Sequence, residues 1–168
     1  MRPYLLSLPF LLSLACAAPE RESAQSSEAA QSEAQSIKGI YSVPSSDPAI
    51  AAVAKYPVTV KIHPIGENLV RMHYDLPITL VGVKQEVEFI GPPEGTLTGD
   101  AGVAECSATP EGRVCNERFT NITVDVAAVS TAVNADPTLT AAQRTALIDA
   151  SSDFAIDPVG VLTFTPKR

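Results

Sequence analysis

Short segments in which apolar and polar residues alternate constrain the fold of this chain most strongly. Val58, Val60 and Ile62 alternate with polar neighbours, which is the period of a strand with one buried face. Similar alternation occurs in residues 69–74, 80–90, 122–126 and 159–165. Gly- and Pro-containing turns separate several of these segments. The pattern predicts a mainly β domain, an antiparallel sandwich or barrel.

The first two segments predict a hairpin with its turn in residues 64–68. Placing residue 63 opposite residue 69 brings three apolar pairs onto one face. These pairs are Val58 with Tyr74, Val60 with Met72, and Ile62 with Val70.

Residues 138–151 predict one short helix in the C-terminal half. Thr140 and Gln143 have the spacing of a capping box. A stripe at helical spacing follows the same stretch: Leu139, Ala142, Ala146, Leu147 and Ala150. Residues 47–54 are a candidate for a second short helix.

Cys106 and Cys115 flank a predicted β-turn that contains Pro110 and Gly112. A two-residue loop would place the cysteines directly opposite each other, as a disulfide needs. A three-residue bulged loop would shift them out of register. Two thiolates are too few ligands for a metal, and redox-active pairs usually have closer spacing. We therefore expect a structural disulfide.

The N-terminus has the pattern of a secretory signal. Arg2 precedes an apolar run in residues 4–12, which is too short to span a bilayer. Ala15 followed by Cys16 resembles the lipobox of bacterial lipoproteins. The resemblance implies a diacylglyceryl group on Cys16. Separately, we expect no cofactor. An ordinary secretory signal cut after Ala17 is the alternative.

The rest of the chain divides into two parts. Apart from Pro19, residues 17–36 contain no apolar side chain larger than Ala, so we expect residues 16–36 to be the lipid-attachment cysteine and a disordered tether. Residues 37–168 are long enough for a single domain with a core. Residues 1–15 would be removed as the signal peptide.

The charge balance limits the possible partners. The chain has 12 basic and 19 acidic residues and a net charge of −7, which makes nucleic acid an unfavourable partner. The same charge opposes direct adsorption to anionic lipid. Contact with a membrane would therefore depend on the N-terminal lipid, and an envelope protein is the other partner to consider.

Four basic side chains share the outward face of the predicted hairpin: Lys61, His63, Arg71 and His73. They could form an anion-binding patch or half of a metal site. The alternative, which we favour, is a solvated strand face whose charges meet Glu86 and Glu88 on the next strand. We expect no metal site here.

The sequence contains no motif of a serine hydrolase, P-loop, dinucleotide-binding protein or zinc protease, so we expect no catalytic residues and no enzyme. The first hypothesis is a lipid-anchored envelope protein that acts through binding or structural contacts. In Gram-negative lipoproteins a non-acidic residue after the cysteine, here Ala17, implies the outer membrane. The second is a soluble secreted or periplasmic barrel that binds a small apolar ligand. A ligand cavity lined by Val60, Met72, Val87 and Phe89 would favour the second hypothesis, and a filled core the first.

Overall fold

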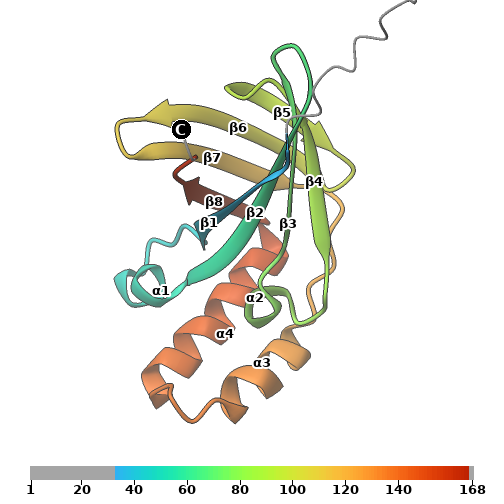
Figure 1. Cartoon of the computed structure of the whole chain (residues 1–168). Helices are drawn as coiled ribbons and strands as arrows, with labels where there is room; N and C mark the ends of the chain where they lie inside the picture. Colours follow the sequence, from blue (N-terminus) through green and yellow to red (C-terminus); the bar gives the residue numbers. More distant parts are fainter. Residues whose placement is uncertain (1–32, 167–168) are drawn as a thin grey trace, which may run out of the picture.

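Eight antiparallel strands form a closed barrel in which each strand pairs with its neighbour in the chain and β8 pairs with β1. The computed structural model describes residues 33–166. The strands are β1 (Gln35–Ser42), β2 (Lys55–Gly66), β3 (Leu69–Asp75), β4 (Glu86–Gly91), β5 (Gly95–Gly99), β6 (Gly102–Thr109), β7 (Gly112–Phe119) and β8 (Val159–Phe164). The mainly β prediction is confirmed, and the architecture is a barrel (Figure 1).

Helices gather at one end of the barrel (Figure 1). They are α1 (Pro48–Val53), α2 (Ile78–Val81), α3 (Val126–Ala135) and α4 (Ala141–Ile156). α4 contacts the other three. Within residues 33–166, none of the helices is long and apolar enough to cross a membrane.

The predicted C-terminal helix exists and is longer than expected. Thr140 accepts a hydrogen bond from the Gln143 amide, and the Gln143 side chain accepts one from the Thr140 amide, so the capping box is confirmed. The helix continues to Ile156. Phe154, in its last turn, is fully buried and packs edge-on against Tyr41 and Phe119 with ring centroids 6.3 and 5.9 Å apart. The end of α4 thereby closes the barrel at the end where the helices lie.

The prediction of a strand at residues 80–90 is wrong for the first half of this segment. Leu80 and Val81 are adjacent and both buried, whereas a strand would direct them to opposite faces. They belong to α2, which ends at Gly82 with φ of 78°. The carbonyl of Leu80 accepts a hydrogen bond from the Ser151 hydroxyl at 2.7 Å. Contacts distant in sequence therefore fix this turn, which alternation alone could not indicate.

The expected strand at residues 122–126 is also wrong. Residues 122–124 have no regular structure, and α3 starts immediately after Asp125. The Asp125 side chain caps the helix by accepting from the Ala128 amide at 2.9 Å. Two helices besides the two candidates from the sequence, α2 and α3, therefore belong to the fold.

Strands β1 and β5 were not predicted. β1 includes Gln35 and Ser36, which we had assigned to the tether, so the domain starts two residues earlier than expected. Gly39 interrupts the apolar face of β1. A side chain there would place its Cβ 2.9 Å from the Thr163 carbonyl oxygen, so the close approach of β1 to β8 requires this glycine.

The β2–β3 hairpin is confirmed, but its register differs from the prediction by two residues. Ile62 lies opposite Met72 rather than Val70. β2 continues to Gly66, and the turn is at Glu67 and Asn68, where Asn68 has a φ of 54°. A shift of two residues leaves every side chain on its predicted face.

The cysteine hairpin agrees with the prediction. Cys106 lies opposite Cys115, Thr109 lies opposite Gly112, and the two cysteines form a disulfide. Both cysteines are buried, so they face the barrel interior.

Candidate functional site

The end of the barrel opposite the helices is open, and we call it the mouth. The turns after β2, β4 and β6 lie there, together with the start of β1 at Gln35. A cavity of about 190 Å³ opens at this end. Its apolar wall includes Ile62, Val70, Met72, Leu97 and Phe164.

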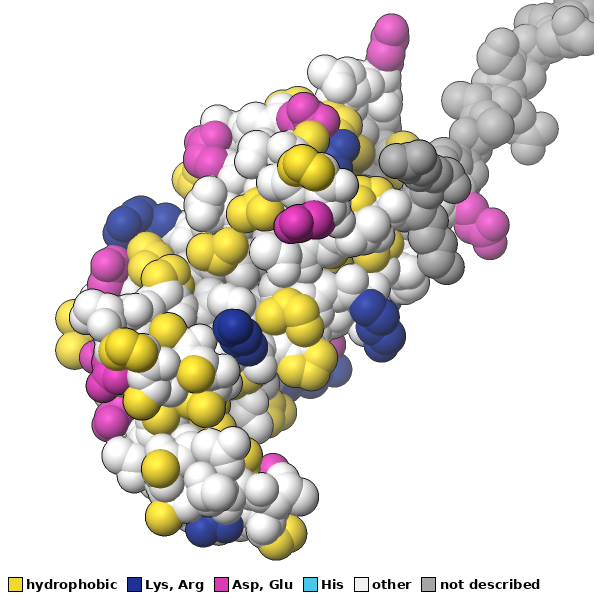
Figure 2. All heavy atoms as spheres, turned by 90° about the vertical axis from the view of Figure 1, so that its left-hand side faces the viewer, with side chains coloured by type: hydrophobic (Ala, Val, Ile, Leu, Met, Phe, Trp, Pro, Cys, Tyr) yellow, Lys and Arg dark blue, Asp and Glu magenta, His cyan; other side chains and the backbone are white. Residues whose placement is uncertain are grey.

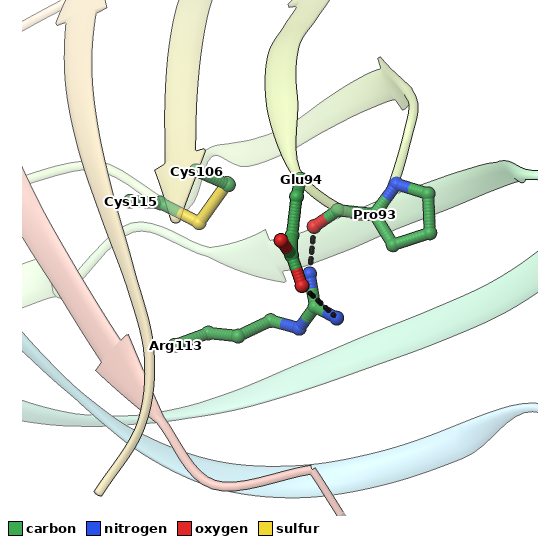
Figure 3. A network of polar contacts seen from close by, with 5 residues as sticks. All are labelled: Pro93, Glu94, Cys106, Arg113 and Cys115. Carbon is green, nitrogen blue, oxygen red and sulfur yellow. Dashed lines mark hydrogen bonds and ion pairs between the residues drawn. A yellow bond between two sulfur atoms is a disulfide. The ribbon is translucent and has the colours of Figure 1, made fainter. Parts of the chain in front are cut away.

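Among the described residues of the cavity wall, Arg113 is the one with a charged side chain. It precedes Cys115 by two residues on β7, so both side chains face inward. Its Nη1 donates to the Pro93 carbonyl, and its Nη2 lies 3.6 Å from Glu94 Oε1 (Figure 3). Arg113 thus connects β7 to the turn between β4 and β5. Its guanidinium is engaged by protein groups rather than free in the cavity.

The disulfide lies beside this network (Figure 3). Cys106 contributes to the cavity wall, while Cys115 is fully buried. The bond joins β6 and β7 directly below their turn. It therefore fixes the strand that carries Arg113.

A second polar group lies on the same inward face of β7. Glu117 is 3% exposed, and its Oε2 accepts a hydrogen bond from the Tyr74 hydroxyl. Burial raises the pKa of Glu117 to about 8, although the bond from Tyr74 acts in the opposite direction. At neutral pH the side chain is therefore mostly a neutral acid.

The surroundings of Glu117 explain how the barrel accommodates it. Gly160 of β8 lies directly opposite, and a side chain there would overlap the hydroxyl of Tyr41. Burial raises the pKa of Tyr41, and the nearby Glu117 raises it further. Glu117 Oε1 and the Tyr41 hydroxyl have no hydrogen-bond partner among the described residues. No salt bridge within residues 33–166 includes Glu117. We therefore interpret the hydrogen bond between Glu117 and Tyr74 as a polar contact inside the barrel.

The structure brings together all four residues of the predicted basic patch. Lys61 lies opposite His73 and His63 opposite Arg71, and the two imidazole rings stack with centroids 5.3 Å apart. Two of the four meet acidic partners on β4. Arg71 Nε is 3.5 Å from Glu88 Oε2, and His73 Nε2 is 3.5 Å from Glu86 Oε1. No cluster of three or more His, Cys, Asp or Glu side chains suited to a metal occurs in the described part of the chain.

The four residues that would line an interior ligand cavity under the second hypothesis are core residues. Val60, Met72, Val87 and Phe89 are at most 2% exposed, and only Met72 among them reaches the mouth cavity. Lipidation at Cys16 lies outside the described residues.

Sequence reasoning did not identify Arg113 or Glu117 as inward-facing. The signal was present, because both differ from Cys115 by two positions, and a strand directs alternate residues to one face. If the disulfide faces inward, these two side chains must do so as well.

The outer surface offers a weaker candidate. Figure 2 shows one face, on which hydrophobic side chains are scattered among basic and acidic ones. A larger hollow of about 420 Å³ lies across β1, β7 and β8 and is more open to solvent than the mouth cavity. The mouth cavity is less open than this hollow and has the more apolar wall, so it is the better candidate site. No protein-family model, no curated protein and no solved structure matches this chain.

Proposed function

We propose that this chain is a lipid-anchored protein of the bacterial envelope whose barrel acts by binding rather than by catalysis. The observation that carries the binding role is the distribution of space inside the barrel. Large buried side chains such as Tyr41, Tyr74, Phe89 and Phe154 fill the interior, and an apolar-walled cavity lies at the mouth. A filled interior favours contacts at the mouth and the surface over a deep ligand chamber.

The N-terminal pattern supports the anchor. Ala15 and Cys16 follow an apolar run, and acylation with two or more chains would make membrane attachment stable. β1 starts at the mouth, so an anchor on Cys16 would connect to this end of the barrel. Residues 17–34 could span at most about 60 Å. An anchored barrel could therefore reach a partner in the envelope or at the outer membrane.

Mass spectrometry of the mature N-terminus tests the anchor. We expect Cys16 to carry acyl chains, and Cys16→Ala to abolish both acylation and partition into the membrane fraction. Ser13→Ala is the matched control, since it changes a neighbouring residue without removing the thiol. A mature protein that starts at Ala18 would contradict the anchor and support the soluble secreted or periplasmic barrel.

A further inference from the structure

We propose that the mouth cavity binds an uncharged apolar group about the size of an aromatic ring system. The inference deepens the proposed function, because it rests on the barrel acting as a binding module. It does not depend on whether Cys16 carries a lipid.

The size of the cavity limits the ligand. It measures about 190 Å³, whereas a cavity of about 150 Å³ lined by aliphatic and aromatic side chains is enough to bind benzene. Drug-sized ligands occupy pockets of roughly 300 Å³ or more. The mouth therefore suits a single ring, two fused rings or one large apolar substituent of a larger molecule.

The wall of the cavity determines the chemistry. Ile62, Val70 and Leu97 come from three different strands and present aliphatic surface to the same space. Met72 and Phe164 add a thioether and a ring, both of which pack well against aromatic groups. Transfer of an apolar ring from water to this wall is favourable by the hydrophobic effect.

The charges at the mouth argue against a carboxylate ligand. Arg113 already donates to the Pro93 carbonyl and lies 3.6 Å from Glu94. A ligand carboxylate would have to displace Glu94 to obtain the same contact. Glu67 and Glu111 occupy the two other turns at this end, which adds repulsion for an anion. The basic residues 167 and 168 lie outside the described part of the chain.

Arg113 is accordingly a positioning residue. It holds Pro93, itself part of the cavity wall, against the β6–β7 hairpin. The disulfide, two residue pairs further from the turn in the same hairpin, keeps that hairpin in register. The cavity is thus bounded by groups held in place before a ligand arrives, which reduces the entropic cost of binding.

Indole is a suitable probe, because the chain contains no tryptophan and the fluorescence of indole can be excited selectively. The full mature chain carrying Cys16→Ser avoids the need for detergent, which could itself occupy an apolar cavity. We expect a blue-shifted emission and a dissociation constant on the order of 1 mM. Indole-3-acetate carries the same ring with a negative charge and should bind more weakly than indole.

Val70→Phe should fill the cavity and weaken indole binding about tenfold or more. Val103→Phe is the matched control, since Val103 is exposed on the outer face of β6, and it should leave binding unchanged. Circular dichroism checks that each variant is folded, and Ile62→Phe replaces Val70→Phe if the latter is not. A rise in the melting temperature with indole gives a second readout.

Absence of indole binding, equal binding by the cavity-filling variant, or tighter binding of indole-3-acetate would each overturn the proposal. Indole binding to a chain that mass spectrometry shows to be unacylated would uphold the cavity and refute the anchor alone. Acylated Cys16 without indole binding would uphold the anchor and refute binding in the cavity.

Discussion

Glu117→Gln should remove most of the pH dependence of stability between pH 4.5 and about 8. Glu117 is buried, and its folded pKa is about 8 against an ordinary value of 4.5. Between these two values the folded protein keeps the proton while the unfolded chain has lost it. The unfolded chain then binds fewer protons, so the free energy of unfolding falls as the pH rises.

The magnitude follows from the difference between the two pKa values. Each pH unit in this window costs about 1.4 kcal/mol, so the full window from 4.5 to 8 corresponds to roughly 5 kcal/mol. Above the folded pKa the loss levels off. Stability from this group is fully present below pH 4.5 and is lost as the pH rises to about 8. The neutral amide of the variant cannot ionise and should show no such loss.

Urea denaturation at a series of pH values measures the effect. The natural chain should lose stability steadily across the window, and Glu117→Gln should be nearly flat over the same range. Glu105→Gln is the matched control, because Glu105 is exposed on β6 and its removal should preserve the slope. Identical slopes for the natural chain and Glu117→Gln would refute the reasoning.

Three further predictions concern stability. Replacing Cys106 and Cys115 together by Ala should lower the free energy of unfolding by about 2–3 kcal/mol by the loop-entropy argument. A reductant should have no further effect on the urea unfolding of this variant. A urea midpoint equal to that of the natural chain would contradict the prediction. Gly160→Ala should cost about 2 kcal/mol or more, because its methyl group would overlap both the hydroxyl and the ring of Tyr41, and the loss should be reduced in a Tyr41→Leu background. Equal losses in the two backgrounds would exclude that contact as the cause. Thr140→Ala should cost about 1 kcal/mol through loss of the α4 cap, measured by thermal unfolding, with Thr140→Ser retaining most of the stability.

Local patterns were sufficient for much of the barrel. Alternation identified β2, β3, β8 and the second half of the segment that contains β4, and the turn between the cysteines fixed the register of their hairpin. Thr140 and Gln143 correctly marked the start of α4. Each of these features is encoded within about ten residues of sequence.

Features that depend on distant contacts were not accessible in the same way. α2 is a short turn whose Leu80 carbonyl is bonded to Ser151, and no local pattern distinguishes it from the start of a strand. Gly39 weakens the alternation in β1 for a reason that exists only when β8 lies beside it. The mouth cavity likewise requires closure of β8 on β1, a pairing of the two ends of the domain.

The candidate site was predicted only in part. The disulfide was expected, and it could have led to Arg113 and Glu117 through the strand period. The basic patch around His63 was correctly placed on one outer face, where Arg71 and His73 are now seen to meet Glu88 and Glu86.

Binding at the mouth can be tested most directly by NMR, with the methyl signals of the isotopically labelled mature chain followed during addition of indole. We predict saturable shifts at Ile62, Val70 and Leu97, which line the cavity, and little change at Val129 and Leu147 in the helices at the opposite end. Shifts confined to the helical end, or no saturable shifts at all, would contradict a barrel that binds through its mouth.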